Sequence, residues 1–360
     1  MTRQRPKLDV LQAGRGIAAL LVVLFHANVI FTAAKYWGHE AWPGFRMGHA
    51  GVEFFFVLSG FIITHIHLGE VGKPSALPRF ALKRLVRIYP AYWAALALVI
   101  ATLFASPAAD AGASRAPMAL LQSALLVPTA ESPHLKVAWT LRHELLFYLL
   151  FAALLANRRL GLAVLGLWFA GCAVWSVVGA DTFPGSFYLA TFNLLFPMGM
   201  ACAWTLQHRS VPAPAVVALG GIGIFAAAGM ADVVGGPGRL LTIVYGIGSA
   251  LAILGLVELE RSRDLRVPRP LTVLGDASYS VYLIHYLALS VTAKALSAAG
   301  LITRLPPVLA FVLLVAAGVS TGLVFRLLVE KPAVDWLARV LIPSRRASEP
   351  GPELQAARPG

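Results

Sequence analysis

The chain has 360 residues, of which 58% are hydrophobic and 13% are charged. A soluble domain carries about a quarter charged residues, so the composition excludes an ordinary soluble protein. The net charge of +13 does not indicate a nucleic-acid-binding protein. The basic residues occur in short segments between apolar runs, and no soluble basic surface is visible.

Ten apolar runs, each long enough to cross a bilayer, follow one another along the chain. We expect membrane-spanning helices at residues 14–34, 49–68, 88–106, 138–156, 160–178, 186–205, 213–231, 238–257, 276–298 and 306–329. The runs are continuous rather than alternating in polarity, which excludes a β-barrel. The first run is too long for the apolar region of a signal peptide. The predicted fold is therefore all-α, a polytopic bundle of about ten transmembrane helices.

Lys and Arg are distributed unequally between the two sides of this bundle. The segments on the side of the N-terminus hold 20 of these residues and those on the opposite side hold 6. The positive-inside rule then places both termini in the cytoplasm. We expect one membrane domain at residues 1–343, followed by a polar, Pro/Gly-rich cytoplasmic tail at 344–360 that is disordered.

The first span, "GRGIAALLVVLFHANVIF" at residues 14–31, contains Arg15 and His26. The two are eleven positions apart, which places them within about 20° of one helix face and about 16 Å apart along the axis. Arg15 alone fits a snorkelling residue at the membrane surface. A histidine at mid-membrane depth needs polar neighbours or water, so the pair indicates a functional site.

The third span opens with "LKRLVRIYP" at residues 82–90, in which Lys83, Arg84 and Arg87 form a cationic cluster. Arg84 and Arg87 share one helix face. Ordinary anchoring on the cytoplasmic side accounts for this segment alone. Three cations in this position also suit a phosphate group, which arginine binds in a bidentate manner.

Two further spans carry polar residues on one face. "WTLRHELLFYLLF" at residues 139–151 places Glu144 and Tyr148 four positions apart, and "SYSVYLIHY" at 278–286 places Ser278, Tyr282 and His285 on one stripe. Polar residues inside a membrane span face a partner or a water-filled cavity. The alternative for both stripes is hydrogen bonding between helices.

Several other polar residues in the spans have weaker patterns. The second span, "GVEFFFVLSGFII" at residues 51–63, carries Glu53 near its outer end and Ser59 near mid-depth, but the G-x-S-x-G motif of a serine nucleophile is absent. Glu330 stands at the inner end of the tenth span, where we expect a structural role at the end of the helix. Cys172 and Cys202 lie in apolar runs without zinc spacing, so we expect buried thiols and no metal site.

Together these segments resemble the acyltransferase-3 family of integral-membrane O-acyltransferases, in particular its exopolysaccharide acetyltransferase branch. The resemblance covers residues 8–336, and it depends on the order of "LDVLQAGRGIAALLVVLFHA", "GVEFFFVLSGFII", "RLVRIYPAYW", "WTLRHELLFYLLF", "SYSVYLIHY" and "EKP". Many members have "LR" before "GIA", whereas this chain has "AGRGIA" and keeps only the arginine. The C-terminal esterase-like domain of some members does not appear in this sequence.

The resemblance implies a multi-pass protein of the bacterial inner membrane that transfers an acyl group, with acetyl-CoA as the donor substrate. The acceptor that it implies is a hydroxyl of a surface glycan or lipid-linked sugar. The family's motifs place catalytic roles on His26, Glu144 and His285, and donor binding on Arg15, Arg84 and Arg87, with Lys83 beside them. We expect Ser59, Tyr148, Ser278 and Tyr282 to line the cavity.

The competing hypothesis is a glycan exporter or proton-coupled transporter without acyl transfer, because intramembrane His and Glu also suit proton relays. The Arg pair aligned with a buried histidine favours the enzyme, since a proton relay needs no phosphate-binding site. The sequence leaves open the acceptor sugar, the length of the acyl chain, the oligomeric state and the need for a partner protein. It also leaves open whether the acyl group is transferred directly or through an acyl-enzyme.

Overall fold

The protein is described by a computed structural model that covers residues 8–105, 114–263 and 265–342. These residues form helices and contain no β-strand. The expected tail at 344–360 lies outside them. The long helices are α1 (Asp9–Thr32), α2 (Gly51–His67), α3 (Leu77–Ala105), α5 (Trp139–Ala156), α6 (Arg158–Val178), α8 (Leu195–His208), α9 (Pro214–Gly235), α10 (Arg239–Ser262), α11 (Arg269–Ala298) and α12 (Pro307–Phe325).

Shorter elements connect or extend these helices. They are η1 (Pro43–Ala50), η2 (Leu68–Glu70), η3 (Pro74–Ala76), α4 (Pro117–Ala124), η4 (Lys136–Ala138), α7 (Gly185–Tyr188), η5 (Thr191–Leu194), the π-helical turn η6 (Arg326–Glu330) and α13 (Lys331–Leu341). Among the described residues, ten helical segments are long and apolar enough to cross a membrane, one for each predicted span. The prediction of an all-α bundle with about ten transmembrane helices is confirmed.

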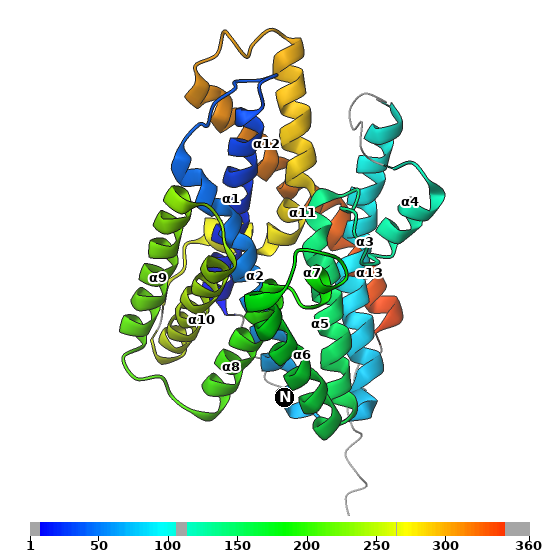
Figure 1. Ribbon diagram of the computed structural model, residues 1–360, viewed down its shortest axis with the longest axis vertical. Helices are drawn as coiled ribbons and strands as arrows, with labels where there is room; N and C mark the ends of the chain where they lie inside the picture. Colours follow the sequence, from blue (N-terminus) through cyan, green and yellow to red (C-terminus); the bar gives the residue numbers. More distant parts are fainter. Residues whose placement is uncertain (1–7, 106–113, 264, 343–360) are drawn as a thin grey trace, which may run out of the picture.

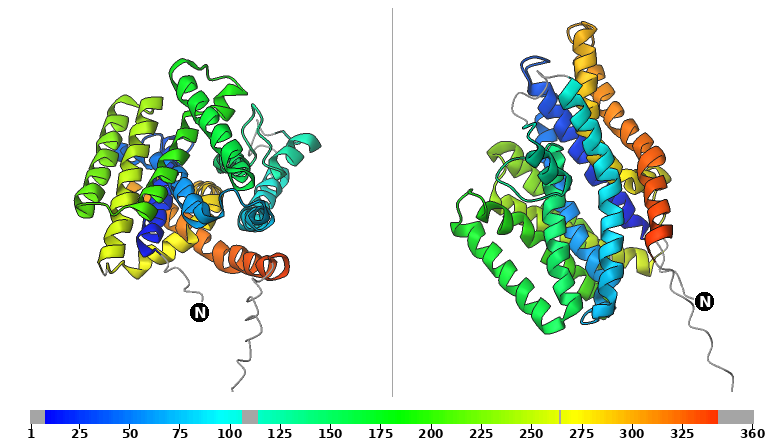
Figure 2. Two further views of the ribbon diagram at one scale, coloured as in Figure 1. Left: turned by 90° about the horizontal axis from the view of Figure 1, so that it is seen from below. Right: turned by 90° about the vertical axis from the view of Figure 1, so that its right-hand side faces the viewer.

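The helices α1, α2 and α11 lie in the middle of the bundle (Figure 1). The pair α9 and α10 flanks them on one side, and α3 and α5 flank them on the other. Figure 2 shows α12 and α13 following one another along one edge of the molecule. We call the side on which α1 begins the inner side, because the distribution of Lys and Arg predicts that it faces the cytoplasm, and the opposite side the outer side.

Two helices begin earlier than the apolar runs indicate. Helix α3 starts at Leu77 rather than near residue 88, and α11 starts at Arg269 rather than near 276. A hydropathy pattern detects only the apolar part of a helix, whereas the helix continues through the polar region at the membrane surface. The cationic cluster of α3 therefore lies in the interior of a helix rather than at its start.

Helix α1 also begins earlier than predicted, at Asp9. Its first backbone N–H groups have no partner within the helix. The side chain of Glu260 at the end of α10 accepts from the backbone N–H of Asp9 at 2.8 Å and from that of Val10 at 3.4 Å. The longer helix places His26 six residues before its outer end at Thr32, so the imidazole lies in the outer half of the span rather than at its middle.

The contact between α1 and α11 depends on a glycine. A Cβ atom added at Gly275 of α11 would lie 1.8 Å from the backbone oxygen of Gln12 in α1. Small residues let transmembrane helices approach closely. The close approach brings the polar stripe of α11 against the polar face of α1.

Candidate functional site

Most of the polar residues expected from the sequence surround one cavity in the inner half of the bundle, which we call the inner cavity. Its volume is about 420 Å³. The expected residues in its wall are Arg15, Ser59, Lys83, Arg84, Arg87, Glu144, Tyr148, Ser278 and Tyr282. They come from α1, α2, α3, α5 and α11. Side chains of α13 and of the residue after it, including Val334 and Ile342, complete the lining.

Arg15 is held in this wall by α11. Its Nε donates to Ser278 Oγ at 3.1 Å, and its Nη1 donates to Gln12 Oε1 at 3.4 Å. The first bond joins α1 to α11, as expected from the polar stripe that begins at Ser278. The guanidinium has five N–H donors, so these two bonds leave others for a ligand.

Arg84 and Arg87 have different surroundings although they share a helix face. Arg87 Nη1 donates to Glu330 Oε1, and Ser280 Oγ donates to the other oxygen of Glu330 at 2.5 Å. The Arg87 guanidinium also lies over the ring of Tyr279, 4.6 Å from its centroid. Arg84 Nε, in contrast, is buried and has no hydrogen-bond partner among the described residues. Arg84 is thus the better placed of the two to bind an anion.

Glu144 faces the inner cavity and is tied to its wall. Tyr148, one turn later in α5, donates its hydroxyl to Glu144 Oε1, and Ser59 of α2 donates to the same oxygen at 3.2 Å. Glu144 therefore lies with the cationic cluster and not in the cavity that contains His26. The resemblance implies catalytic roles for both Glu144 and His26, and the structure places the two side chains in the walls of different cavities.

His26 lines a second cavity, of about 330 Å³, in the outer half of the bundle, which we call the outer cavity. Other polar residues in its wall are His49 of η1, Glu53 of α2 and Lys136 of η4. The Tyr286 ring packs edge-on against His26, with 5.4 Å between the ring centroids. Arg15 and His26 thus belong to one face of α1 but line two different cavities.

His285 contacts His26 from α11. His285 Nε2 is 3.2 Å from His26 Nδ1. His285 Nδ1 lies 3.0 Å from the Val281 carbonyl oxygen and 2.8 Å from that of Tyr282. A carbonyl only accepts, so Nδ1 of His285 carries the proton and its Nε2 accepts in the neutral ring.

This arrangement assigns the tautomer of His26. Its Nδ1 lies 2.9 Å from the Val22 carbonyl oxygen as well as 3.2 Å from His285 Nε2. Both of these atoms accept, so the neutral His26 ring carries its proton on Nδ1. The lone pair is then on Nε2, which is the requirement for a base that acts in the outer cavity.

Tyr282 and Val52 line both cavities. The Tyr282 hydroxyl is fixed between them, because it lies 3.0 Å from the Val137 carbonyl oxygen and 3.0 Å from Thr140 Oγ1. The two cavities therefore have a common part of their walls, with the cationic cluster lining the inner cavity and His26 lining the outer one.

The thiols have no part in either cavity. Cys172 and Cys202 are buried and not in a disulfide, and Cys202 Sγ lies 3.3 Å from the Ala250 carbonyl oxygen. Within residues 8–105, 114–263 and 265–342, no group of three or more His, Cys, Asp or Glu side chains is placed to hold a metal ion.

Comparisons with known proteins identify the family. The family described as "Acyltransferase domain" matches residues 8–327. The chain is 34% identical over 287 residues to "Exopolysaccharide production protein ExoZ" of Rhizobium meliloti (strain 1021), which covers 76% of this chain and 85% of that protein. The chain belongs to the acyltransferase-3 family.

Other relatives of this acyltransferase agree. It is 28% identical to "Putative membrane-bound transacylase BcsY" of Komagataeibacter xylinus over 296 residues. These aligned residues cover 76% of this chain and 70% of that protein. It is also 28% identical to "Peptidoglycan O-acetyltransferase OatA" of Listeria monocytogenes serovar 1/2a (strain ATCC BAA-679 / EGD-e) over 331 residues. These aligned residues cover 81% of this chain and 50% of that protein. No solved structure matches the chain.

The family decides between the two classes of function left open by the sequence. The protein is a multi-pass membrane O-acyltransferase of the exopolysaccharide acetyltransferase-like branch, and not a transporter without chemistry. The resemblance stated from the sequence motifs is confirmed.

Several polar residues of this acyltransferase have partners that the sequence pattern does not predict. Glu330 was interpreted as helix-end structure, and it does lie where η6 meets α13, but it is 2% exposed and paired with Arg87. His49 and Asp232 are a second missed pair, at 2.6 Å. Glu330 is 243 positions from Arg87, and Asp232 is 183 positions from His49. A local pattern in the sequence cannot reveal partners at such separations.

Proposed function

We propose that this acyltransferase moves an acetyl group from cytoplasmic acetyl-CoA to a hydroxyl of a surface or lipid-linked glycan, in the bacterial inner membrane, with His26 as the general base. The observation that carries the proposal is the pair of cavities whose walls share Tyr282 and Val52, one lined by cations and the other by His26. The names of the relatives, which refer to exopolysaccharide production and to peptidoglycan O-acetylation, support a glycan acceptor.

The inner cavity suits the donor. Coenzyme A carries several phosphate groups, and the wall supplies the cations Arg15, Lys83, Arg84 and Arg87. The apolar remainder of the wall suits the pantetheine arm, because ligand cavities combine apolar walls with a few polar groups. Arg87 is already paired with Glu330, so a phosphate would share or replace that partner.

The outer cavity suits the acceptor. An acceptor hydroxyl that donates to His26 Nε2 loses its proton to this nitrogen as its oxygen attacks the thioester carbonyl carbon. The C–S bond then breaks, and the proton on the imidazolium passes to the coenzyme A thiolate. His285 keeps the other ring proton of His26 on Nδ1 through both steps, so Nε2 is the nitrogen that gains and then loses the transferred proton. Ser59, Tyr148 and Glu144 act on the donor side as a hydrogen-bonded part of the cavity wall.

The test compares cells with and without the gene. Mass spectrometry of their surface glycan should detect an O-acetyl group that is present only when the gene is present. The purified protein should then consume acetyl-CoA when it is given unacetylated glycan isolated from cells that lack the gene. Unchanged glycan acetylation in those cells, together with no consumption of acetyl-CoA, would refute the proposal.

A further inference from the structure

A cluster of titratable side chains begins at the wall of the outer cavity with His49 and Glu53 and extends behind it to Asp232 and Tyr245, and the transfer chemistry described above does not use it. His49 Nε2 lies 2.6 Å from Asp232 Oδ2 of α9, and His49 Nδ1 lies 3.5 Å from Glu53 Oε1 of α2. The Tyr245 hydroxyl of α10 donates to the same Asp232 oxygen at 2.9 Å. One imidazole thus connects two carboxylates from different helices.

Glu53 has an unused acceptor in this cluster. Its side chain lines the outer cavity and is 1% exposed, and its Oε2 has no hydrogen-bond partner among the described residues. A buried polar atom without a partner is costly. A carboxylate oxygen only accepts, so the group that satisfies it must be an O–H or N–H donor.

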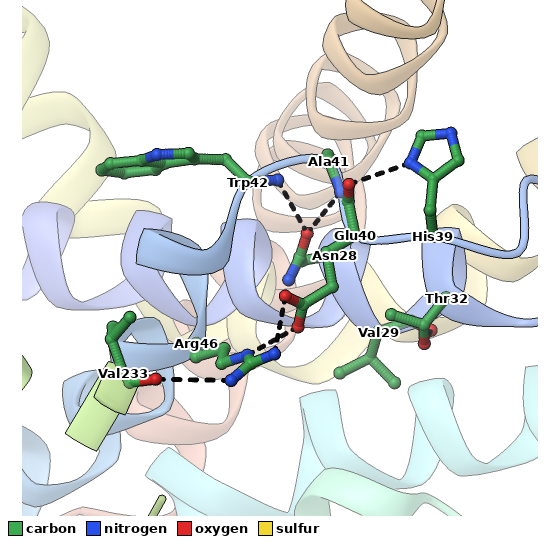
Figure 3. Close-up of polar contacts among 9 residues, drawn as sticks. All are labelled: Asn28, Val29, Thr32, His39, Glu40, Ala41, Trp42, Arg46 and Val233. Atoms are coloured by element: carbon green, nitrogen blue, oxygen red, sulfur yellow. Dashed lines mark hydrogen bonds and ion pairs between the residues drawn. The ribbon is translucent and has the colours of Figure 1, made fainter. Parts of the chain in front are cut away.

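The segment that carries His49 is fixed before any ligand arrives. Asn28 Oδ1 of α1 accepts from the backbone N–H groups of Ala41 and Trp42 at 2.9 and 3.3 Å (Figure 3). Arg46 of η1 donates to Glu40 at 2.7 Å and to the Val233 carbonyl oxygen of α9 at 3.3 Å (Figure 3). These bonds attach the segment to α1 and α9, and the adjacent residue Asp232 then orients His49. Such second contacts keep a binding group in a defined geometry.

The other side chains of the outer cavity suit a ring-shaped ligand. Its wall includes the aromatic side chains of Trp139, Phe192 and Tyr286 besides His26 and Glu53. Flat apolar walls with a small number of placed polar groups are typical of sites that orient a small molecule. His26 and Glu53 offer two acceptors in one cavity, so a fitting ligand has two hydroxyl groups on one ring.

We propose that the outer cavity is the sugar-binding site and that Glu53 is the carboxylate that orients the acceptor. One hydroxyl of the sugar donates to Glu53 Oε2, and this places a second hydroxyl of the same ring at His26. His49 and Asp232 are positioning residues that hold Glu53. This inference depends on the proposed function, because it assigns the acceptor of the same transfer reaction.

The experiment uses the full chain in lipid nanodiscs. Coenzyme A binding is titrated, and the rate of acetyl transfer is measured against the concentration of unacetylated glycan isolated from cells that lack the gene. Glu53→Gln should lower kcat/KM for the glycan on the order of 10- to 100-fold, since the sugar hydroxyl then donates to a neutral amide instead of a charged carboxylate. The affinity for coenzyme A should stay within about two-fold of wild type, because the donor side is untouched.

A separate measurement, the KM for the glycan, tests the positioning residues His49 and Asp232. His49→Gln and Asp232→Asn should each raise the KM for the glycan, and neither should add to the loss when combined with Glu53→Gln, because residues of one network are not additive. The matched controls are His39→Gln and Asp181→Asn, since His39 is exposed and the Asp181 side chain is 90% exposed, both outside the two cavities. The controls should behave like wild type.

Several outcomes would overturn the inference. An unchanged kcat/KM for the glycan in Glu53→Gln, or an equal loss of coenzyme A affinity and glycan transfer, would show that Glu53 is not the acceptor-binding residue. If Glu53→Gln does not fold, Glu53→Asp keeps the charge and must still raise the KM for the glycan. A wild-type protein that neither binds coenzyme A nor acetylates the glycan would overturn the proposed function as well, whereas an active wild type with an insensitive Glu53 overturns this inference alone.

Discussion

His285 Nε2 lies 3.2 Å from His26 Nδ1, although 259 positions separate the two residues in the chain. The contact exists because α1 and α11 pack closely where Gly275 meets Gln12. Two backbone carbonyl groups hold the proton of His285 on Nδ1, and His285 in turn leaves the lone pair of His26 on Nε2. The two histidines are therefore suited to different roles in the proposed reaction, with His26 as the base and His285 as the residue that orients it.

Replacement of His26 by alanine should abolish most of the acyl transfer. A general base contributes roughly 10²–10⁴-fold to a rate, and the structure offers His26 for that role in the outer cavity. Expression and thermal stability should stay close to wild type, because the ring makes one hydrogen bond to its own helix and one to His285. Glycan acetylation at the wild-type rate in His26→Ala cells would contradict the assignment of the base.

Replacement of His285 by alanine should have a smaller effect, of roughly ten-fold, because His26 keeps its bond to the Val22 carbonyl group and part of its tautomer preference. The rate should also depend on pH differently from wild type, since a second ring no longer fixes the proton of the base. A loss as large as that of His26→Ala, with an unchanged pH profile, would show that His285 is structural or is itself the base. The measurement is kcat as a function of pH for the two variants side by side.

The sequence predicts the fold well because membrane helices are encoded locally. Each span needs an apolar run of sufficient length, and each of the ten predicted runs matches a helical segment of membrane-spanning length within the residues that the structure describes. The predicted starts of α1, α3 and α11 are too late because charged and polar residues interrupt the apolar pattern in the first two turns of these helices. The amphipathic helix α13 was not predicted, since "PAVDWLARVL" lacks the continuous apolar run by which spans were found.

The candidate site was predicted in part, for a related reason. Helical periodicity identified the faces of α5 and α11 that line the inner cavity, because spacing along one helix determines a face. Periodicity does not say which faces of different helices meet. It therefore pairs Glu144 with Tyr148 of its own helix, but it does not predict the contact with Ser59 of α2, and it gives no partner for Arg87.

Arg84→Ala and Arg87→Ala should both weaken binding of acetyl-CoA, since both line the inner cavity, but only Arg87→Ala should also destabilise the protein. Glu330 is buried, so loss of Arg87 leaves a carboxylate without its cation. The cost should be about 3 kcal/mol, the lower end of the range for a broken buried pair, because 34% of the Arg87 side chain is exposed. Acetyl-CoA titration and thermal unfolding in one lipid composition check this contrast.

The matched variants are Arg84→Lys and the double variant Arg87→Ala with Glu330→Gln. Lysine should restore donor binding only in part, since it lacks the planar, bidentate group of arginine. The double variant should recover stability but not donor affinity, because the unpaired charge is gone while the cation is still missing. Wild-type donor affinity in both single alanine variants would show that the two arginines only anchor α3 at the membrane surface.

Gly275→Ala should reduce activity strongly and lower stability. The added Cβ would lie 1.8 Å from the Gln12 backbone oxygen, so α1 and α11 would have to separate, and His285 would move away from His26. Overpacking of this kind typically costs about 1–3 kcal/mol. The control is Gly220→Ala in α9, where an added Cβ meets nothing within 4 Å. Equal activity of the two variants would mean that the contact between α1 and α11 does not set the geometry of the histidines.

The donor and the acceptor should approach from opposite sides of the membrane. The inner cavity contains the cations that the charge distribution places toward the cytoplasm, and the outer cavity contains His26, about 16 Å along the helix from Arg15 in a hydrocarbon core about 30 Å thick. Tyr282 and Val52 are in the walls of both cavities, so we expect the acetyl group to be transferred beside them while coenzyme A stays on its own side. In vesicles of one orientation, acetylation should occur with acetyl-CoA confined to the cytoplasmic side and unacetylated glycan on the other. Acetylation only when both substrates share the cytoplasmic side would contradict transfer across the membrane, and would place the reaction before export of the glycan.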